Sequence, residues 1–471
     1  MAKRLNFIFD YVTPHGHLGF GYQRKEIPEI FEYATHLNFD KSLQVFHCRR
    51  NENQEIKHST SFFVEELLGE HIDSTVITTD DIKNNNVNEG EEYLIPFESV
   101  NFRTHFSEIL EPTFSFDDCF SKKLLRLIKK YSNFKILFVD AREGSYYVDK
   151  EIFTKMQTWL DSHNIRHINK IIISSCDELL EKKIPNDNRF VFFNNDSYIS
   201  AAGQFVIQVQ KKDKTLLGDI ERDNYEYDLK LEFEESNPKK YFNMFNRNSE
   251  RIHRPYFVGR LKEENLLDKG YVSLFRNIDF ENWVDNHMDE EDTSSVYGIQ
   301  VTPTMKETIR EIKNKYPYYI DEEDAERVAN LHNFLSVKKP YVESLFTIVS
   351  ETNASSDYLF ITEKTLKPIM NLHPFFVVGN PHTLKKLKRL GFKTFSMLWD
   401  ESYDDELDFA KRTEMIIKEV KDLCNLSFEE LTQKFRKIKN ICIYNREVLV
   451  KLYYRNYKYN QLLQCLKKEI I

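Results

Sequence analysis

An acidic and a basic residue, Glu363 and Lys364, follow a threonine in the segment I-T-E-K, which is typical of the start of a helix. This segment stands between two apolar runs, residues 345–349 and 374–379. Strand, loop, helix and strand in this order are the pattern of a parallel βαβ unit. Ligands of such sheets bind at the carboxyl ends of the strands. Both charged side chains are therefore candidates for binding a ligand.

A second group of charged residues lies upstream, in a polar turn that contains Arg247, Arg251 and Arg254. The turn follows a predicted strand at residues 240–245 and precedes a predicted helix. Arginine binds phosphate through bidentate, charge-assisted hydrogen bonds, and lysine supplies a compact positive charge. A carboxylate such as Glu363 can accept hydrogen bonds from the cis-diol of a ribose. These residue types predict a clamp for a nucleotide diphosphate that also stabilises the leaving diphosphate.

Each part of this clamp also has a purely structural interpretation. Thr362 is a good N-cap, and Glu363 is favourable in the first turn of a helix. Arginine-rich turns are often solvated surface. The functional interpretation depends on the two groups occurring together in one strand–loop–helix domain.

Length and composition limit the class of protein. The chain has 471 residues, with 41% hydrophobic and 30% charged side chains, which predicts a globular protein of two or three domains. The net charge of −9 argues against a general nucleic-acid binder, so no nucleic-acid partner is expected. No apolar run approaches the ~20 residues that a membrane helix needs.

The cysteines and the N-terminus indicate a compartment. The six cysteines are scattered and include no C-x-x-C pair, which argues against a zinc site and fits a reducing environment. The N-terminal M-A-K-R-L-N-F-I-F-D is interpreted as a strand and not as a signal peptide. We therefore expect a cytoplasmic protein.

Apolar periodicity predicts an α/β fold. A first α/β domain is expected over residues 1–235, a second over residues 236–405, and helices over residues 406–471 that pack on one or both domains. The predicted elements of the first domain include strands at residues 5–9, 74–78, 135–140, 170–174 and 189–193 and helices at 119–131 and 149–162. In the second domain, a further strand is expected at residues 391–395. Asp400 and Glu401 follow that strand, either facing a cleft or forming a cap and turn.

Asp140 ends the near-continuous apolar run K-I-L-F-V-D, which is typical of a central parallel strand. An acidic side chain at the carboxyl end of such a strand is placed to face a cleft. A helix cap or a loop anchor is the alternative.

The segment S-E-T-N-A-S-S-D-Y-L-F-I-T-E-K-T-L-K-P-I, with H-P-F-F-V-V-G after it, resembles the donor-site motif of the α-1,3-fucosyltransferases and related family-10 glycosyltransferases. That motif runs roughly F-E-N-S-x-x-x-D-Y-V-T-E-K, then a helix, then x-P-V-x-x-G. The upstream N-R-N-S-E-R-I-H-R-P-Y-F-V-G-R-L resembles the family's N-x-x-x-x-x-R-x-x-F-x-x-x-L segment. The resemblance covers about residues 240–400. The chain departs from the motif by one inserted residue in E-T-N, two in D-Y-L-F-I-T-E-K, and T-L-K-P after T-E-K.

The resemblance implies two Rossmann-like domains facing a cleft (GT-B type), with the acceptor side first. It also implies transfer from a GDP-linked sugar with inversion and no essential metal or other cofactor. By position in the motif, Arg254 would contact the diphosphate, and Asn353 and Tyr358 would line the donor pocket. Glu363 would hold the ribose and Lys364 the phosphates.

The family places a glutamate general base after a strand of the first domain. The matching residue is Glu143 in V-D-A-R-E-G, with Asp140 as the second candidate. The expected function is an inverting glycosyltransferase that moves a sugar, possibly fucose, from a nucleotide-diphosphate donor to a glycan hydroxyl. The alternatives are an inactive fold that binds glycans or assembles with a partner, and a transferase with another donor or a non-glycan acceptor.

Overall fold

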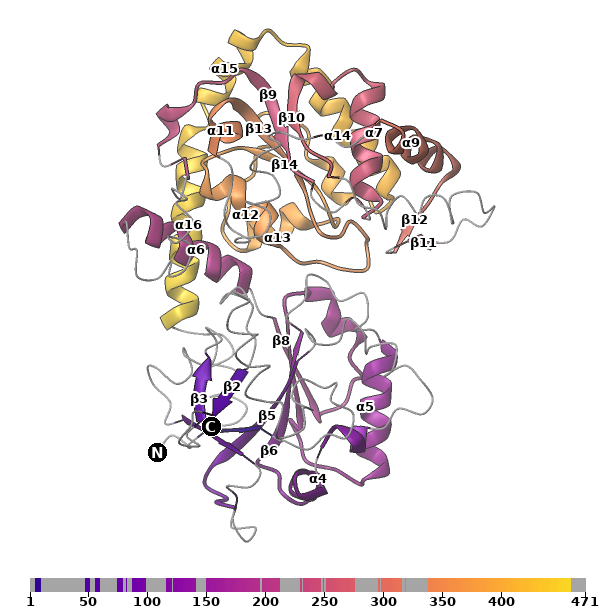
Figure 1. The fold of residues 1–471 in the computed structure, drawn as a ribbon, viewed down its shortest axis with the longest axis vertical. Coiled ribbons are helices and arrows are strands. Elements are labelled where there is room, and N and C mark those ends of the chain that lie inside the picture. The colour runs from indigo at the N-terminus through magenta and orange to yellow at the C-terminus, as the bar shows by residue number, and fades with distance from the viewer. Residues whose placement is uncertain are drawn as a thin grey trace. The chain divides into compact units, whose positions relative to one another are not determined.

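The computed structural model describes residues 5–9, 47–50, 56–59, 74–78, 82, 87–98, 116–120, 122–140, 150–194, 197–211, 229–230, 232–246, 249, 251–275, 295–296, 298–315, 318 and 338–458. The chain divides into two compact units (Figure 1). The first unit comprises Met1–Ser197 with Arg455–Ile471, and the second comprises Tyr198–Tyr454. The three segments expected from the sequence, residues 1–235, 236–405 and 406–471, stay a prediction.

The first unit is built on a six-stranded parallel sheet with the strand order β4-β1-β5-β6-β7-β8. The strands are β1 (Leu5–Phe9), β4 (Ser74–Thr78), β5 (Glu92–Glu98), β6 (Phe134–Asp140), β7 (Ile171–Ser175) and β8 (Phe190–Asn194). The chain places β4 on one side of β1 and the later strands on the other. A separate antiparallel pair is formed by β2 (His47–Arg50) and β3 (Ile56–Ser59).

Two helices cover the sheet with their apolar faces. They are α4 (Lys122–Lys130) and α5 (Lys150–Ser162), and Figure 1 shows α5 beside the sheet. Phe138 of β6 and Phe153 of α5 meet edge to face with ring centroids 6.4 Å apart. The nearly continuous apolar sequence of β6 is explained by its place in the sheet, with a strand on each side.

Strand β5 was not singled out by its sequence, since it contains Pro96 and follows a polar stretch. Proline has no N–H to donate, so it is disfavoured in central strands. The register explains why it is tolerated, because β1 pairs with β5 only from Glu92 to Leu94. Pro96 lies beyond that stretch, where β5 pairs with β6 alone.

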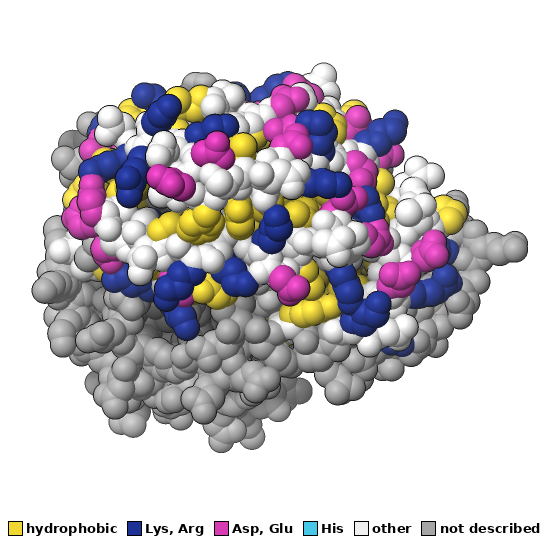
Figure 2. Space-filling model, turned by 90° about the horizontal axis from the view of Figure 1, so that it is seen from above, with side chains coloured by type: hydrophobic (Ala, Val, Ile, Leu, Met, Phe, Trp, Pro, Cys, Tyr) yellow, Lys and Arg dark blue, Asp and Glu magenta, His cyan; other side chains and the backbone are white. Residues whose placement is uncertain are grey.

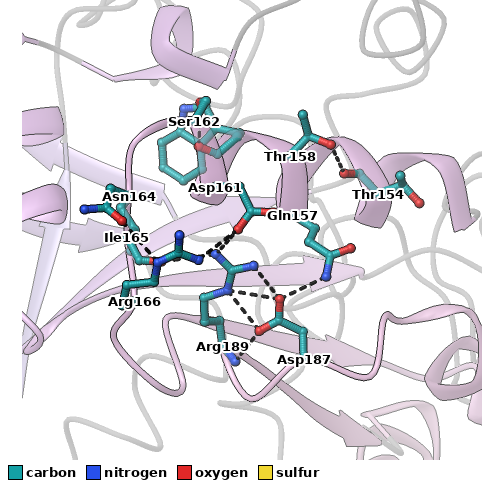
Figure 3. Close-up of polar contacts among 11 residues, drawn as sticks. Thr154, Gln157, Thr158, Asp161, Ser162, Asn164, Ile165, Arg166, Asp187 and Arg189 are labelled. Atoms are coloured by element: carbon teal, nitrogen blue, oxygen red, sulfur yellow. Dashed lines mark hydrogen bonds and ion pairs between the residues drawn. The ribbon is translucent and has the colours of Figure 1, made fainter.

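An ion-pair network holds the end of α5 against the start of β8 (Figure 3). Arg189 is 6% exposed and binds the Asp187 carboxylate through Nε, at 2.9 and 3.0 Å, and through Nη2, at 2.5 Å. Its Nη1 donates to Asp161 at 2.8 Å and to the carbonyl of Ile165 at 3.1 Å. Gln157 of α5 donates to the same Asp187 carboxylate at 3.0 Å. The network lies at the amino edge of the sheet and is structural.

The second unit is built on a four-stranded parallel sheet with the strand order β10-β9-β13-β14. The strands are β9 (Lys240–Met244), β10 (Gly270–Val272), β13 (Ser344–Ser350) and β14 (Phe375–Val378). The helices next to this sheet include α7 (His253–Glu263), α9 (Pro303–Lys313), α11 (Lys338–Val342), α12 (Glu363–Met370) and α13 (Thr383–Arg389). The strands and the helix predicted around I-T-E-K are confirmed. The strand predicted at residues 391–395 is wrong, since this segment begins with a turn and continues without regular secondary structure.

The helices expected in the tail are confirmed up to residue 458, as α14 (Phe409–Cys424), α15 (Phe428–Arg436) and α16 (Lys439–Lys458), and residues 459–471 lie outside the described residues. The apolar face of these helices packs on the second sheet, where Phe435 stacks on Phe346 of β13 with centroids 5.9 Å apart. Helix α6 (Ser197–Lys211) packs on α16 so closely that a Cβ at Gly203 would lie 2.5 Å from Tyr453 Cβ. The three helices therefore contribute to the core of the second unit up to Tyr454.

Acidic and basic side chains are intermixed on the surface of one face of the molecule (Figure 2). Some ion pairs of the second unit join helices, as Arg260 of α7 binds Glu414 of α14 at 2.7 Å. Exposed pairs of this kind contribute up to about 1 kcal/mol each.

The predicted α/β class is confirmed, with a parallel sheet in each unit that is compatible with Rossmann-like domains. Within the described ranges, every helix is too short or too polar to cross a membrane.

Removing the charge of Asp187 should weaken the first unit in a pH-dependent way. Its hydrogen bonds with Arg189 lower the pKa of Asp187 from 3.8 to about 2. The folded pKa is below the unfolded one, so the stabilisation is present above pH 3.8 and is lost as pH falls toward 2. Asp187→Asn should lower the free energy of unfolding by about 1 to 2 kcal/mol at pH 7, allowing for solvent screening. Urea titrations between pH 7 and 3 should show this difference shrinking below pH 4, whereas Asp161→Asn at the exposed partner should have a smaller effect.

Candidate functional site

The candidate site lies at the carboxyl edge of the second sheet. β9 and β13 are neighbours there, while β10 lies outside β9 and β14 lies outside β13. The strand order therefore reverses between β9 and β13, which makes this position a topological switch point. Ligands of open α/β sheets bind at such points. The loop after β9 leads to α7, and the loop after β13 leads to α12. These are the two segments that carry the predicted arginine and T-E-K groups.

Glu351, the first residue after β13, anchors the start of α12. It is 1% exposed, and its carboxylate accepts five hydrogen bonds. Thr362 donates to it from Oγ1 at 2.6 Å and from its backbone N at 3.3 Å. Thr365 donates from Oγ1 at 2.5 Å and from its backbone N at 3.3 Å, and the Thr352 N–H donates at 3.1 Å. The positive end of the helix is thus satisfied by a carboxylate of the protein itself.

The backbone carbonyl of the same residue binds the start of α7. Arg254 Nη2 donates to the Glu351 carbonyl at 3.2 Å, and His253 Nε2 lies 2.8 Å from the same oxygen. Burial, with the positive charge of Arg254 beside it, lowers the pKa of His253 well below 6.5. His253 is therefore neutral and donates its Nε2 proton to the carbonyl. Both side chains are at most 4% exposed.

The T-E-K segment forms the beginning of α12 as predicted. Thr362 is the N-cap, and its hydroxyl accepts from the Lys364 N–H at 3.3 Å. Glu363 is 5% exposed, and its carboxylate pairs with Lys364 Nζ at 2.5 Å. The Lys364 side chain is 24% exposed. The structural interpretation of Thr362 is confirmed, and the ligand-binding roles of all three residues stay predictions.

The loop between β13 and α12 carries the other two predicted donor residues. Asn353 is 1% exposed, and its Oδ1 accepts from the Ser355 N–H at 2.7 Å. Tyr358 is partly buried. Arg412 of α14 reaches into this loop and donates to the Ala354 carbonyl at 2.5 Å. Burial lowers the pKa of Arg412 to about 10, which leaves it charged at neutral pH.

The two candidate general bases belong to the first unit. Asp140 is the last residue of β6 and pairs with Ser175 of β7, so it lies at the carboxyl edge of the first sheet as expected. Its side chain is not among those described, and Glu143 lies outside the described residues. Their catalytic roles stay predictions.

Asp400 and Glu401 form a turn, which was one of the two interpretations of this segment. Glu401 accepts from the Phe395 N–H at 2.6 Å and from Thr394 Oγ1 at 2.7 Å. Asp400 accepts from the Ser402 N–H at 2.9 Å and from its hydroxyl at 2.7 Å. These carboxylates are engaged in holding residues 394–402 together.

Sequence reasoning missed three residues that organise the site, namely Glu351 as an anchor, His253 and Arg412. Only Glu351 carries a signal in the sequence, as an acidic residue directly after an apolar strand. Across the described residues, no group of three or more His, Cys, Asp or Glu side chains is arranged to hold a metal ion.

Comparison with known proteins adds no family assignment. No protein-family model matches the chain, and no curated protein shows significant similarity to it.

Replacing Glu351 by glutamine should destabilise the second unit. The variant removes the charge that compensates the positive end of α12 and places an NH2 group among hydrogen-bond donors. We expect the free energy of unfolding to fall by about 2 kcal/mol or more. Urea unfolding measures this loss, and amide exchange should accelerate at Thr362 and Thr365. Asp408→Asn is the matched control, because it converts an exposed N-cap carboxylate of α14 into an equally good capping amide. Equal stability of the two variants would contradict the anchoring role.

Proposed function

We propose that the chain is an inverting glycosyltransferase that moves a sugar, most simply fucose, from a GDP-linked donor to a glycan hydroxyl. The observation that carries the proposal is the meeting of two distant segments at Glu351. Arg254 binds its carbonyl, and the T-E-K helix is anchored on its carboxylate. These are the segments that resemble the family's donor motif, and they meet at the reversal point of a parallel sheet.

Within this proposal, Arg254 and Lys364 supply the positive charge that binds the diphosphate. The backbone groups at the start of α12 contribute less, because Thr362 and Thr365 donate their N–H groups to Glu351. Glu363 holds the ribose, and Asn353 and Tyr358 contact the donor. Arginine and lysine charges also stabilise the diphosphate as it leaves.

The transfer step requires a general base on the acceptor side. Glu143, or Asp140 in its place, removes the proton of the acceptor hydroxyl as that oxygen attacks the anomeric carbon. The bond from this carbon to the diphosphate breaks, and the configuration at the carbon inverts. A GT-B arrangement, with two Rossmann-like domains facing a cleft, belongs to the proposal.

A second candidate function is a fold without transferase activity that binds glycans or a partner. The Glu363–Lys364 ion pair favours it, because each charge already has a partner within the protein. The two candidates differ in nucleotide binding, which only the transferase requires.

Nucleotide binding should be detectable in the full-length chain by thermal shift with GDP, UDP, CDP and ADP. A specific nucleotide at one hundred times its Kd stabilises the protein by about 2.7 kcal/mol, and we expect GDP to do so. Arg254→Lys loses the planar, bidentate donor and should weaken binding about tenfold. Arg260→Lys on the same helix is the control, since it retains the exposed pair with Glu414 and should bind within about twofold of wild type. If none of the four nucleotides shifts the melting temperature, the transferase proposal fails.

The base is tested separately from the nucleotide. Glu143→Gln should lower turnover of GDP-fucose by about 100-fold or more, because general base catalysis contributes 10²- to 10⁴-fold. Its affinity for GDP, measured by calorimetry, should be unchanged. Asp140→Asn should have the smaller effect. If Asp140→Asn abolishes turnover while Glu143→Gln is active, the two roles are exchanged.

A further inference from the structure

A short hairpin of the second unit lies directly against the loop that carries Asn353. It consists of β11 (Ser295–Val296) and β12 (Ile299–Gln300), which pair antiparallel, with Gly298 in the turn. Gly298 has φ +73°, in the left-handed region that favours glycine. A Cβ at this position would lie 2.4 Å from Ser355 Oγ and 3.0 Å from Ser355 Cβ. The hairpin backbone therefore approaches Ser355 as closely as only a glycine permits.

Ser355 is in turn bonded to three residues. Its N–H donates to Asn353 Oδ1 at 2.7 Å, and its hydroxyl accepts from the Asp357 N–H at 3.1 Å. Its carbonyl accepts from Asn380 Nδ2 at 2.7 Å, which ties it to the residues after β14. Ser355 is 1% exposed. Its position is thus set by the hairpin on one side and by the sheet edge on the other.

The contact with Ser355 determines how the Asn353 amide is oriented. Because Oδ1 accepts from the Ser355 N–H, the other amide atom, Nδ2, points away from Ser355 and is available as a donor. No described residue accepts a hydrogen bond from Nδ2, although the atom is buried. A buried donor without a partner is costly, and a ligand oxygen is one group that removes the cost.

We propose that the β11–β12 hairpin is a positioning element of the candidate site. Gly298, seated on Ser355, fixes the Asn353 amide so that Nδ2 donates to an oxygen of the bound ligand. Gly298 and Ser355 are positioning residues, and Asn353 makes the contact. The identity of the ligand as a nucleotide sugar rests on the proposed function, while the positioning does not.

The test introduces a steric clash at Gly298 and then removes it with a second substitution at Ser355. Gly298→Ala places a methyl group on Ser355, displaces it and rotates the Asn353 amide. Ser355→Gly removes the two closest atoms that the methyl group meets. The next atom, Asp357 Oδ2 at 3.1 Å, is the end of a flexible side chain that can move aside, so the double variant Gly298→Ala/Ser355→Gly should regain the arrangement. Gly391→Ala is the matched control, because Gly391 also has positive φ, +96°, but the nearest atom to a Cβ there is 3.8 Å away. The control carries backbone strain of the same kind without the collision.

Calorimetric titration of the full-length chain with GDP-fucose should give a Kd about tenfold weaker for Gly298→Ala. Gly391→Ala should remain within twofold of wild type, and the double variant within threefold of Ser355→Gly. Hydrogen exchange should be faster at the Ser355 amide in Gly298→Ala and unchanged in Gly391→Ala. Wild-type affinity in Gly298→Ala, or a double variant as weak as Gly298→Ala, overturns the positioning role.

The exchange measurement keeps this inference separate from the proposed function. If the wild-type chain binds neither GDP-fucose nor any of the four nucleotides, the proposed function fails. Exchange at Ser355 still decides the positioning in that case. Unchanged protection of the Ser355 amide in Gly298→Ala then refutes it, and exchange that is faster in Gly298→Ala but unchanged in Gly391→Ala supports it.

Discussion

A single buried carboxylate organises the carboxyl edge of the second sheet. Glu351 stands between β13 and the loop to α12, and it binds the helix start with its side chain and α7 with its carbonyl. A buried ionised group is stable only when its oxygens are fully hydrogen-bonded. Thr362 and Thr365 meet this requirement, and the positive end of α12 adds to it. Glu351 is too buried to contact a ligand itself. The hydrogen bonds that its carboxylate and carbonyl accept nevertheless set the positions of the candidate ligand-binding side chains.

The elements of this edge were predictable from sequence because their signals are local. β13 and β14 are short apolar runs, and Thr362 is followed by a helical sequence that it caps. β6 was predictable for the same reason, because it is a nearly continuous apolar run that ends in Asp140. β5 could not be predicted in this way. Its strand can contain Pro96 only because β1 stops pairing with β5 before that residue, and the register of pairing is not visible in the local sequence.

The organisation of the site was not predictable, because its bonds join residues far apart in the chain. Glu351 reaches 11 and 14 residues forward to its threonines, and Arg254 reaches 97 residues to Glu351. Arg412 binds a carbonyl 58 residues away, and nothing in the local sequence of α14 marks it as different from an exposed helix arginine. When such a residue is buried, its side chain binds the backbone of a distant segment instead of water. Which residues are buried depends on the packing of the whole unit. Sequence patterns therefore led to the residue types of the proposed clamp but not to Glu351, which joins the two segments that carry them.

The route of the chain has a consequence for its synthesis. The second unit, Tyr198–Tyr454, is inserted within the first, because Arg455–Ile471 returns to the unit that begins at Met1. The inserted unit is contiguous, whereas the outer unit is discontinuous and receives its last segment only after the whole insertion has left the ribosome. Domains generally fold as units during synthesis. All residues of the inserted second unit are therefore synthesised before the last segment of the first unit.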